Sequence, residues 1–143
     1  MKRREFVRRL PVVTTGLLVG ASSLSLSACG GAAYIVPTVR PSGLSFPASL
    51  LDGQGEIFLQ TPSMERPLFL HLGEDGPVAL LLSCTHRGCQ PEPVGTRLIC
   101  PCHGSEFSKL GEVLQGPAEE PLTRYDVSRD GDDFVVHVEG GAR

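Results

Sequence analysis

The chain of 143 residues has no tryptophan and only eight aromatic residues, two tyrosines and six phenylalanines. Its core must therefore be built mainly from aliphatic side chains. The chain also lacks an excess of basic charge after residue 29, since residues 30–143 carry 8 basic and 15 acidic side chains, a net charge of −7. A nucleic-acid binder needs a basic face, so we expect no nucleic-acid partner. The acidity serves solubility, or it steers the chain towards a basic partner such as a soluble cytochrome.

No stretch after residue 30 sustains a helical pattern, and no internal repeat occurs. Brief apolar or alternating runs are bounded instead by Gly, Pro or Asp, which is typical of strands and turns. These runs cover residues 56–60, 68–72, 77–83, 96–100, 122–128 and 133–139, and one more strand is expected around 33–39. The sequence predicts an all-β fold, an antiparallel sandwich or barrel. With 17 Gly and 12 Pro the domain should be rich in loops and should benefit from a crosslink or a metal.

Residues 1–29 resemble a targeting segment. The twin arginines Arg3 and Arg4 resemble a twin-arginine signal, the export route of proteins that fold before crossing the membrane. The apolar region at 11–28 is diluted by serine, threonine and glycine, so it is too weak and too short for a membrane span. The alternative is a soluble, basic amphipathic tail. We expect export to the periplasm or the outer face of the membrane.

LSAC, at residues 26–29, resembles a lipoprotein processing site, in which the chain is cut before a cysteine that carries lipid. Cys29 is then the odd one among five cysteines. A lipid on Cys29 would hold the domain at a membrane surface without spanning it. The alternatives are an ordinary cleavage region with an incidental thiol, or an uncleaved anchor. Residues 30–45 are expected to form a linker, and residues 46–143 the folded domain.

Two clusters of Cys and His stand in loops that follow predicted strands, CTHRGC at 84–89 and CPCHGS at 100–105. They supply six candidate ligands or crosslinks: Cys84, His86, Cys89, Cys100, Cys102 and His103. From the residue types alone, three interpretations are open. The first is a zinc site of two Cys and two His. The second is two disulfides with bystander histidines. The third is a [2Fe–2S] centre with two Cys on one iron and two His on the other.

The order of residues in these two loops resembles that of the Rieske iron–sulfur family, and the resemblance extends over roughly residues 55–139. It implies an antiparallel β fold with a small cluster-binding subdomain, at about 82–108, set in a larger base. It also implies that Cys84 and Cys100 bind one iron of a [2Fe–2S] cluster. The same resemblance gives the other iron to His86 and His103, and a disulfide to Cys89 and Cys102. GPAEEP, at 116–121, is similar to the family's proline-rich loop that covers the cluster.

This ligand set has a clear redox consequence. Two neutral imidazoles in place of two thiolates make the cluster less negative, so an incoming electron meets less repulsion. Rieske centres accordingly lie at roughly −150 to +300 mV, against about −400 mV for plant-type clusters with four thiolates. An iron-bound imidazole also loses its second proton more readily than a free one, and reduction should strengthen its hold on that proton. Such coupled uptake of an electron and a proton suits the oxidation of a quinol.

Two further positions are expected to tune the cluster. Ser105 stands where the family's serine hydroxyl reaches a bridging sulfide, and Phe107 stands where many high-potential members carry a tyrosine. Because that hydroxyl is missing, we predict a lower potential than in the tyrosine-bearing relatives. Arg87 replaces the leucine usual at the tip of quinol-oxidising relatives, which weakens the case for docking on cytochrome b. His71 and His137 are interpreted as ordinary surface or edge residues.

The sequence therefore predicts an exported, membrane-tethered electron-transfer protein that performs no bond chemistry of its own. The expected setting is a respiratory oxidoreductase of the quinol–cytochrome c type, with a cytochrome b and a c-type cytochrome as redox partners. The alternatives are the small subunit of a molybdenum oxidase, partnered by a molybdopterin subunit, and a stand-alone periplasmic carrier. A cytosolic Rieske ferredoxin is disfavoured by Cys89, Cys102 and the export signal. The non-redox alternative is a zinc-stabilised binding module.

Overall fold

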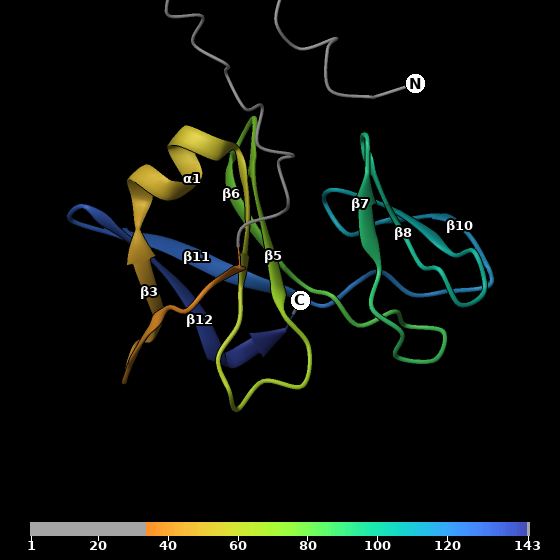
Figure 1. The fold of residues 1–143 in the computed structure, drawn as a ribbon, viewed down its shortest axis with the longest axis horizontal. Helices are drawn as coiled ribbons and strands as arrows, with labels where there is room; N and C mark the ends of the chain where they lie inside the picture. Colours follow the sequence, from red (N-terminus) through yellow and green to blue (C-terminus); the bar gives the residue numbers. More distant parts are fainter. Residues whose placement is uncertain (1–33, 143) are drawn as a thin grey trace, which may run out of the picture. The chain divides into compact units, whose positions relative to one another are not determined.

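The structure, a computed structural model, describes residues 34–142, and side chains from Tyr34 to Val138. The expected signal segment, 1–29, and its Cys29 lie outside the described residues. The described part is mostly β (Figure 1). One sheet has eight strands: β1 (Tyr34–Ile35), β2 (Thr38–Arg40), β3 (Gly43–Pro47), β4 (Glu56–Leu59), β5 (Leu68–Gly73), β6 (Gly76–Leu81), β11 (Arg124–Asp130) and β12 (Asp133–Ala142). The predicted β architecture, with a small subdomain beside a larger base, is confirmed.

The large sheet curls until its two edges approach each other. Its strand order is β1-β4-β5-β6-β11-β12-β3-β2, so β1 and β2 stand at opposite edges although only Val36 and Pro37 connect them. A flat sheet of eight strands would hold its edges roughly 34 Å apart, at about 4.8 Å per step. Two connecting residues span at most roughly 11 Å. The sheet is therefore a half-barrel, whose pairs are antiparallel except for the parallel pair of β1 and β4.

The segment expected to be a linker, residues 30–45, contains β1, β2 and most of β3, which pair with other strands of the sheet. Edge strands of two or three residues are too short to show an alternating pattern, which is why the sequence indicated only one strand there. No helix was expected either, but α1 (Ala48–Gln54) follows β3 and packs across one end of the sheet (Figure 1).

Helix α1 has only seven residues, too few for a helical period to stand out, and it buries Ala48 and Leu51 on one face. It ends at Gly55, whose N–H donates to the Leu51 carbonyl over 2.7 Å. No helix within residues 34–142 has the length and apolar character that a membrane crossing needs.

A second, four-stranded antiparallel sheet is inserted in the chain between β6 and β11 of the large one and is drawn to the right of β5 and β6 in Figure 1. Its strands are β7 (Glu92–Val94), β8 (Arg97–Ile99), β9 (Glu106–Ser108) and β10 (Val113–Gln115), in the order β10-β9-β8-β7. The sequence predicted only β8 of these. Strands of three residues carry too little periodicity to be distinguished from loops.

Two hydrophobic cores explain why β4, β5 and β6 read as nearly continuous apolar runs. Ile57, Leu70 and Ala79 belong to a core shared with β3 and β12, inside the half-barrel. Their neighbours on the opposite face, including Phe69 and Leu80, belong to a second core shared with the four-stranded sheet. Strands covered on both faces lose the alternation that marks a half-exposed strand. The second core also contains two cysteines, Cys84 and Cys100, and so reaches the candidate metal centre.

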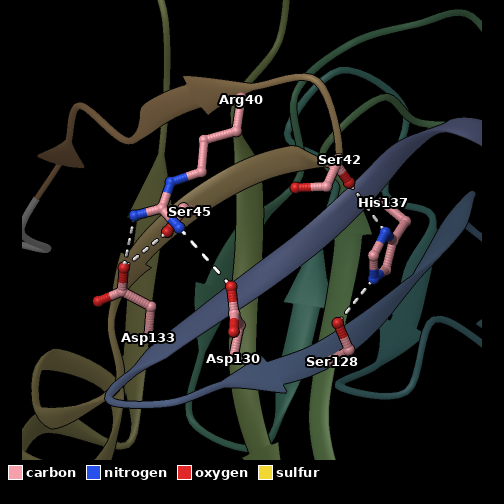
Figure 2. A network of polar contacts seen from close by, with 7 residues as sticks. All are labelled: Arg40, Ser42, Ser45, Ser128, Asp130, Asp133 and His137. Atoms are coloured by element: carbon pink, nitrogen blue, oxygen red, sulfur yellow. Dashed lines mark hydrogen bonds and ion pairs between the residues drawn. The ribbon is translucent and has the colours of Figure 1, made fainter.

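The outer face of β2, β3, β11 and β12 carries a polar network (Figure 2). Arg40 on the edge strand β2 donates to the Asp133 carboxylate over 3.0 Å and lies 3.7 Å from that of Asp130, and the Ser45 hydroxyl also donates to Asp133. His137 is half-buried rather than a plain surface residue. Its Nδ1 lies 2.9 Å from the Ser42 carbonyl and its Nε2 lies 2.7 Å from the Ser128 hydroxyl. The network ties the short edge strand to the sheet.

Candidate metal centre

The two Cys/His loops close with the same backbone pattern. In the first loop, after β6, the Cys84 N–H donates to the Cys89 carbonyl over 2.8 Å, and the Gly88 N–H donates to the Cys84 carbonyl over 2.7 Å. In the second loop, after β8, Cys100 donates to Ser105 over 2.8 Å, and Gly104 donates to Cys100 over 3.0 Å. Each loop therefore begins with a cysteine that bonds to the residues four and five positions later. The two loops, residues 84–89 and 100–105, thus have a similar backbone shape and are called the two hooks.

The glycine at the fifth position of each loop is required by the backbone. Gly88 has φ 74° and Gly104 has φ 77°, both in the left-handed region that other residues enter only at a cost. This conformation turns the chain back so that the fifth N–H reaches the first carbonyl. This backbone conformation explains why glycine stands at the fifth position of both CTHRGC and CPCHGS.

The first cysteine of each loop points into the second core. Cys84 is 3 % exposed and Cys100 is 1 % exposed, and both are free thiols. Burial raises the pKa of the Cys100 thiol, and the neighbouring Cys84 thiol raises it further, while hydrogen bonds from the Cys102 and His103 backbones lower it. Two adjacent, buried sulfurs with backbone donors aimed at one of them could form one half of a metal site, because a bound metal replaces the thiol protons.

The two histidines form the other half. The rings of His86 and His103 lie with their centroids 4.8 Å apart and their planes at 88°. His103 is exposed and His86 is half-buried. The Nδ1 atom of His86 is buried and has no hydrogen-bond partner. A buried ring nitrogen without a partner is costly in a protein, so this orphaned atom fits a metal ligand.

The structure joins Cys89 and Cys102 in a disulfide, as the resemblance implied, with a Cα–Cα distance of 6.4 Å. The bond links the end of the first loop to the middle of the second. The sulfurs of Cys89, Cys100 and Cys102 lie within 4.8 Å of one another. These three atoms are not a metal site, however, because two of them are bonded to each other and metals bind thiolates.

A third loop, residues 116–121, is hydrogen-bonded to both hooks and is called the covering loop. The Ser105 hydroxyl accepts from the Ala118 N–H over 3.0 Å in the buried core, and the Thr85 hydroxyl donates to the Glu120 carbonyl over 2.6 Å. Gly104 also accepts a bond from the Gln115 side chain over 3.3 Å. Sequence reasoning identified this loop by its prolines and singled out Ser105, but it did not predict that Thr85 would bond to the loop. No sequence pattern showed which backbone groups lie opposite these hydroxyls.

The remaining predicted residues take different places. Phe107 on β9 is fully buried in the same core as Cys84 and Cys100. Arg87 is exposed at the first loop, next to His86, and forms no ion pair or hydrogen bond with any residue of the described chain. His71 lies away from the two hooks, on β5, where its Nδ1 is 3.6 Å from the Glu56 carboxylate.

Comparison with known proteins agrees with this geometry. The family model of the Rieske [2Fe-2S] domain matches residues 47–126, more than half of the chain. The chain belongs to the Rieske [2Fe–2S] family. Its cofactor is therefore a Rieske [2Fe–2S] cluster and its role is electron transfer. The paired buried thiols, the paired histidine rings and the orphaned Nδ1 fit that cofactor, whereas a single zinc ion would leave the family match unexplained.

Several relatives of this Rieske chain are subunits of one kind of complex. The cytochrome b6-f complex iron-sulfur subunit 2 of Trichormus variabilis is 37% identical over 100 residues, covering 65% of the chain and 56% of the relative. The cytochrome b6-f complex iron-sulfur subunit of Chlorobaculum thiosulfatiphilum is 26% identical over 144 residues, covering 94% and 75%. The chain thus spans little more than half the length of the first of these relatives.

Solved structures show the same Rieske fold. The plasma membrane Rieske protein PetC3 of Synechocystis PCC 6803 has a TM-score of 0.54 and 34% identity, over 63% of this chain and 93% of that one. The complex of oxygenase and ferredoxin in carbazole 1,9a-dioxygenase contains a chain with a TM-score of 0.52 and 22% identity, over 68% and 93%. The second likeness concerns the fold alone.

Proposed function

We propose that this Rieske protein is exported, tethered to a membrane, and passes single electrons through a cluster held by Cys84, Cys100, His86 and His103. The observation that carries the ligand assignment is the pairing of the two hooks. Each contributes one buried cysteine sulfur, and their histidine rings meet edge to face with one nitrogen left without a partner. When bound, the cluster supplies a reversible one-electron store.

The chain's own residues would set the properties of that store. Two thiolates on one side and two neutral imidazoles on the other give the ligand set two negative charges instead of four, which favours the uptake of an electron. The backbone N–H groups of Cys102 and His103 hydrogen-bond to the Cys100 sulfur and stabilise negative charge there. Burial of both sulfurs keeps water from that side of the site.

The exposed side of the site is the expected place of electron exchange. His103 is exposed, whereas the covering loop and the second core enclose the cysteines. A partner that touches the His103 edge therefore meets the shortest path to the cluster. An exposed imidazole also has a proton to exchange with solvent or with a quinol.

The setting that we favour is a quinol–cytochrome oxidoreductase, with a cytochrome b and a c-type cytochrome as neighbours. The support is the resemblance to iron–sulfur subunits of cytochrome b6-f complexes, which covers about two thirds of this chain. To test it, the full chain is isolated from its native membrane after mild crosslinking. Recovery of a b-type cytochrome on the same complex is expected, and recovery of the chain without any haem protein would count against this setting.

Arg87 favours a second candidate, a stand-alone periplasmic carrier or the small subunit of a molybdenum oxidase. The side chain is exposed beside His86 and has no ion-pair partner among the described residues. An unpaired cation is costly to bury in an apolar surface within a membrane complex. Recovery of a molybdopterin subunit in the crosslinking experiment, or of the carrier alone, would favour this candidate.

The tether is tested separately. We expect the full chain to be found at the membrane on the periplasmic or outer side, with lipid on Cys29. Replacing Arg3 and Arg4 with lysines should retain the chain in the cytoplasm. Cys29→Ala should leave export intact but release the chain from the membrane, since a single thioether anchor would be lost. A mature wild-type chain that carries no lipid on Cys29 by mass spectrometry would exclude the lipid anchor.

A further inference from the structure

One free thiol lies next to the disulfide in the candidate metal centre. The sulfurs of Cys89, Cys100 and Cys102 are within 4.8 Å of one another, and only Cys100 is free. Cys84, the other free thiol, is not part of this triangle. A thiolate that reaches a disulfide sulfur can displace the other one, and the reaction needs no outside oxidant. The triangle places an attacking group and its target within one site.

The three sulfurs differ in their access to water. Cys100 is 1 % exposed, Cys89 is half-buried and Cys102 is exposed. The buried sulfur is thus shielded from dissolved reagents but not from the disulfide beside it. The exposed sulfur of Cys102 would be the easiest to release, because water solvates the thiolate that leaves.

We propose that Cys100 attacks the Cys89 sulfur whenever the cluster is absent, so that the Cys89–Cys102 disulfide is exchanged for Cys89–Cys100. The Cys100–Cys89 bond forms as the Cys89–Cys102 bond breaks. Cys102 leaves as a thiolate and takes up the proton that Cys100 gave up, so electrons and protons balance within the chain. This inference rests on the proposed role of Cys100 as an iron ligand, because iron on that sulfur prevents the attack.

Attack on Cys89 is favoured over attack on Cys102 by the chain itself. Only one residue separates Cys100 from Cys102, and a disulfide across so short a stretch strains the backbone. Cys89 and Cys100 are 11 positions apart, close to the 13 positions of the original pair. The two larger loops restrict the unfolded chain to nearly the same extent. Loop size therefore favours neither pairing, and we expect both forms to be populated.

The exchange has a consequence for assembly. A chain with the Cys89–Cys100 bond has lost one of its two cysteine ligands and cannot take up the cluster until that bond is reduced or Cys102 reverses the exchange. Loading is therefore delayed unless iron and sulfide are bound before the disulfide closes. Thiols stay reduced in the cytosol, and disulfides form outside it. A chain that folds and loads its cluster inside the cell, and closes its disulfide after export, avoids the trap.

The experiment uses the full chain with its cluster. One sample is kept intact, and the other is stripped with an iron chelator at neutral pH without oxygen and left to equilibrate. Both are quenched in acid, which stops exchange because the thiolate is the attacking species. They are then digested with pepsin and mapped by mass spectrometry. We expect Cys89–Cys102 alone in the intact sample, and a clear fraction of Cys89–Cys100 with free Cys102 in the stripped one.

Two variants locate the attacking group. In stripped Cys84→Ser the exchange should persist, because Cys100 is untouched. In Cys100→Ser the original disulfide should remain whatever the iron content. A stripped wild-type chain that keeps only Cys89–Cys102, or an exchange that persists in Cys100→Ser, would overturn the inference.

The ligand assignment has its own readout in the same set. Cys100→Ser should contain little iron and acid-labile sulfide, and a full complement in that variant would refute the assignment rather than the exchange chemistry. The stripped wild-type chain also offers a quantitative check. The share of molecules that do not load promptly when iron and sulfide are added should equal the share with Cys89–Cys100, and reduction beforehand should make loading prompt for all of them. Prompt, full reloading without reduction would contradict the proposed trap.

Discussion

The Ala118 backbone N–H donates a 3.0 Å hydrogen bond to the Ser105 hydroxyl oxygen within the buried core. Because the oxygen is the acceptor in this bond, the hydroxyl proton is left over for a second partner. One side chain therefore holds the covering loop and has a donor to offer the cluster. We therefore expect Ser105 to affect both the stability of the site and its redox properties.

Ser105→Ala should lower both stability and midpoint potential. The buried Ala118 N–H would lose its partner, at a cost of about 1–3 kcal/mol. A hydrogen bond to a charged acceptor is worth about 1.5–3 kcal/mol, and about 1.4 kcal/mol corresponds to 59 mV for one electron, so the potential should fall by up to roughly 60–130 mV. Redox titration and urea unfolding measure the two effects.

Ser108→Ala is the matched control for this prediction. The Ser108 hydroxyl accepts bonds of 3.2 Å from the Leu110 and Glu112 N–H groups in a turn after β9, so it shapes the same small sheet. This variant should lose stability but keep its potential. Equal shifts of potential in the two variants would mean that Ser105 acts only through general loosening of the sheet.

Phe107→Tyr should raise the midpoint potential. Phe107 is fully buried in the core that contains Cys84 and Cys100, the two proposed cysteine ligands, and a hydroxyl there would add a donor near their sulfurs. Phe134→Tyr is the control, since Phe134 lies in the other core and undergoes the same chemical change. A redox titration in which Phe107→Tyr matches the wild type would refute the predicted role of this position.

The double variant Cys89→Ser, Cys102→Ser should be less stable by about 3 kcal/mol, the chain-entropy value for a loop of this size. Changing both cysteines avoids leaving one half of the disulfide as a new unpaired thiol. The two hooks would then be joined only through the cluster and the covering loop, so we expect the cluster to be lost at a lower urea concentration. Loss of cluster absorbance and of β-sheet circular dichroism should be followed together. Unchanged midpoints in both would show that the disulfide does not stabilise the site.

Lys109 ties the small sheet to the base. Its ammonium contacts the Glu56 carboxylate on β4, and the Nδ1 atom of His71 lies 3.6 Å from the same carboxylate. The pair is partly buried, so a double-mutant cycle with Lys109→Gln and Glu56→Gln should give a coupling of about 1 kcal/mol. The midpoint potential should stay as in the wild type, because the pair stands away from the two hooks. A coupling near zero would leave the contact without a stabilising role.

The sequence located the two Cys/His loops of the site but not their supports. The residue types alone left zinc, two disulfides and a [2Fe–2S] cluster open, and only the order of residues shared with the Rieske family selected the cluster. The hydroxyls of Ser105 and Thr85 bond to backbone groups of a loop that is distant in the chain, and a backbone acceptor or donor has no sequence signature. Their partners at Ala118 and Glu120 could therefore not be predicted.

The fold, too, was predictable only in part. The alternating or apolar runs that became β4, β5, β6, β11 and β12 are long enough to show a period, and they were predicted. The seven residues of α1 and the three-residue strands β7, β9 and β10 are shorter than the pattern that would reveal them. Strands β1 and β2 are positioned by pairing with edges formed elsewhere in the sequence, so their place in the sheet depends on tertiary structure.

The most direct test of the account is a redox titration, followed by electron paramagnetic resonance, of the wild type and of the double variant His86→Cys, His103→Cys. We predict a wild-type midpoint within roughly −150 to +300 mV, and a fall towards about −400 mV once four thiolates surround the cluster. An unchanged midpoint in the double variant, or a wild-type protein that contains no iron and labile sulfide, would contradict the assignment of these histidines as ligands.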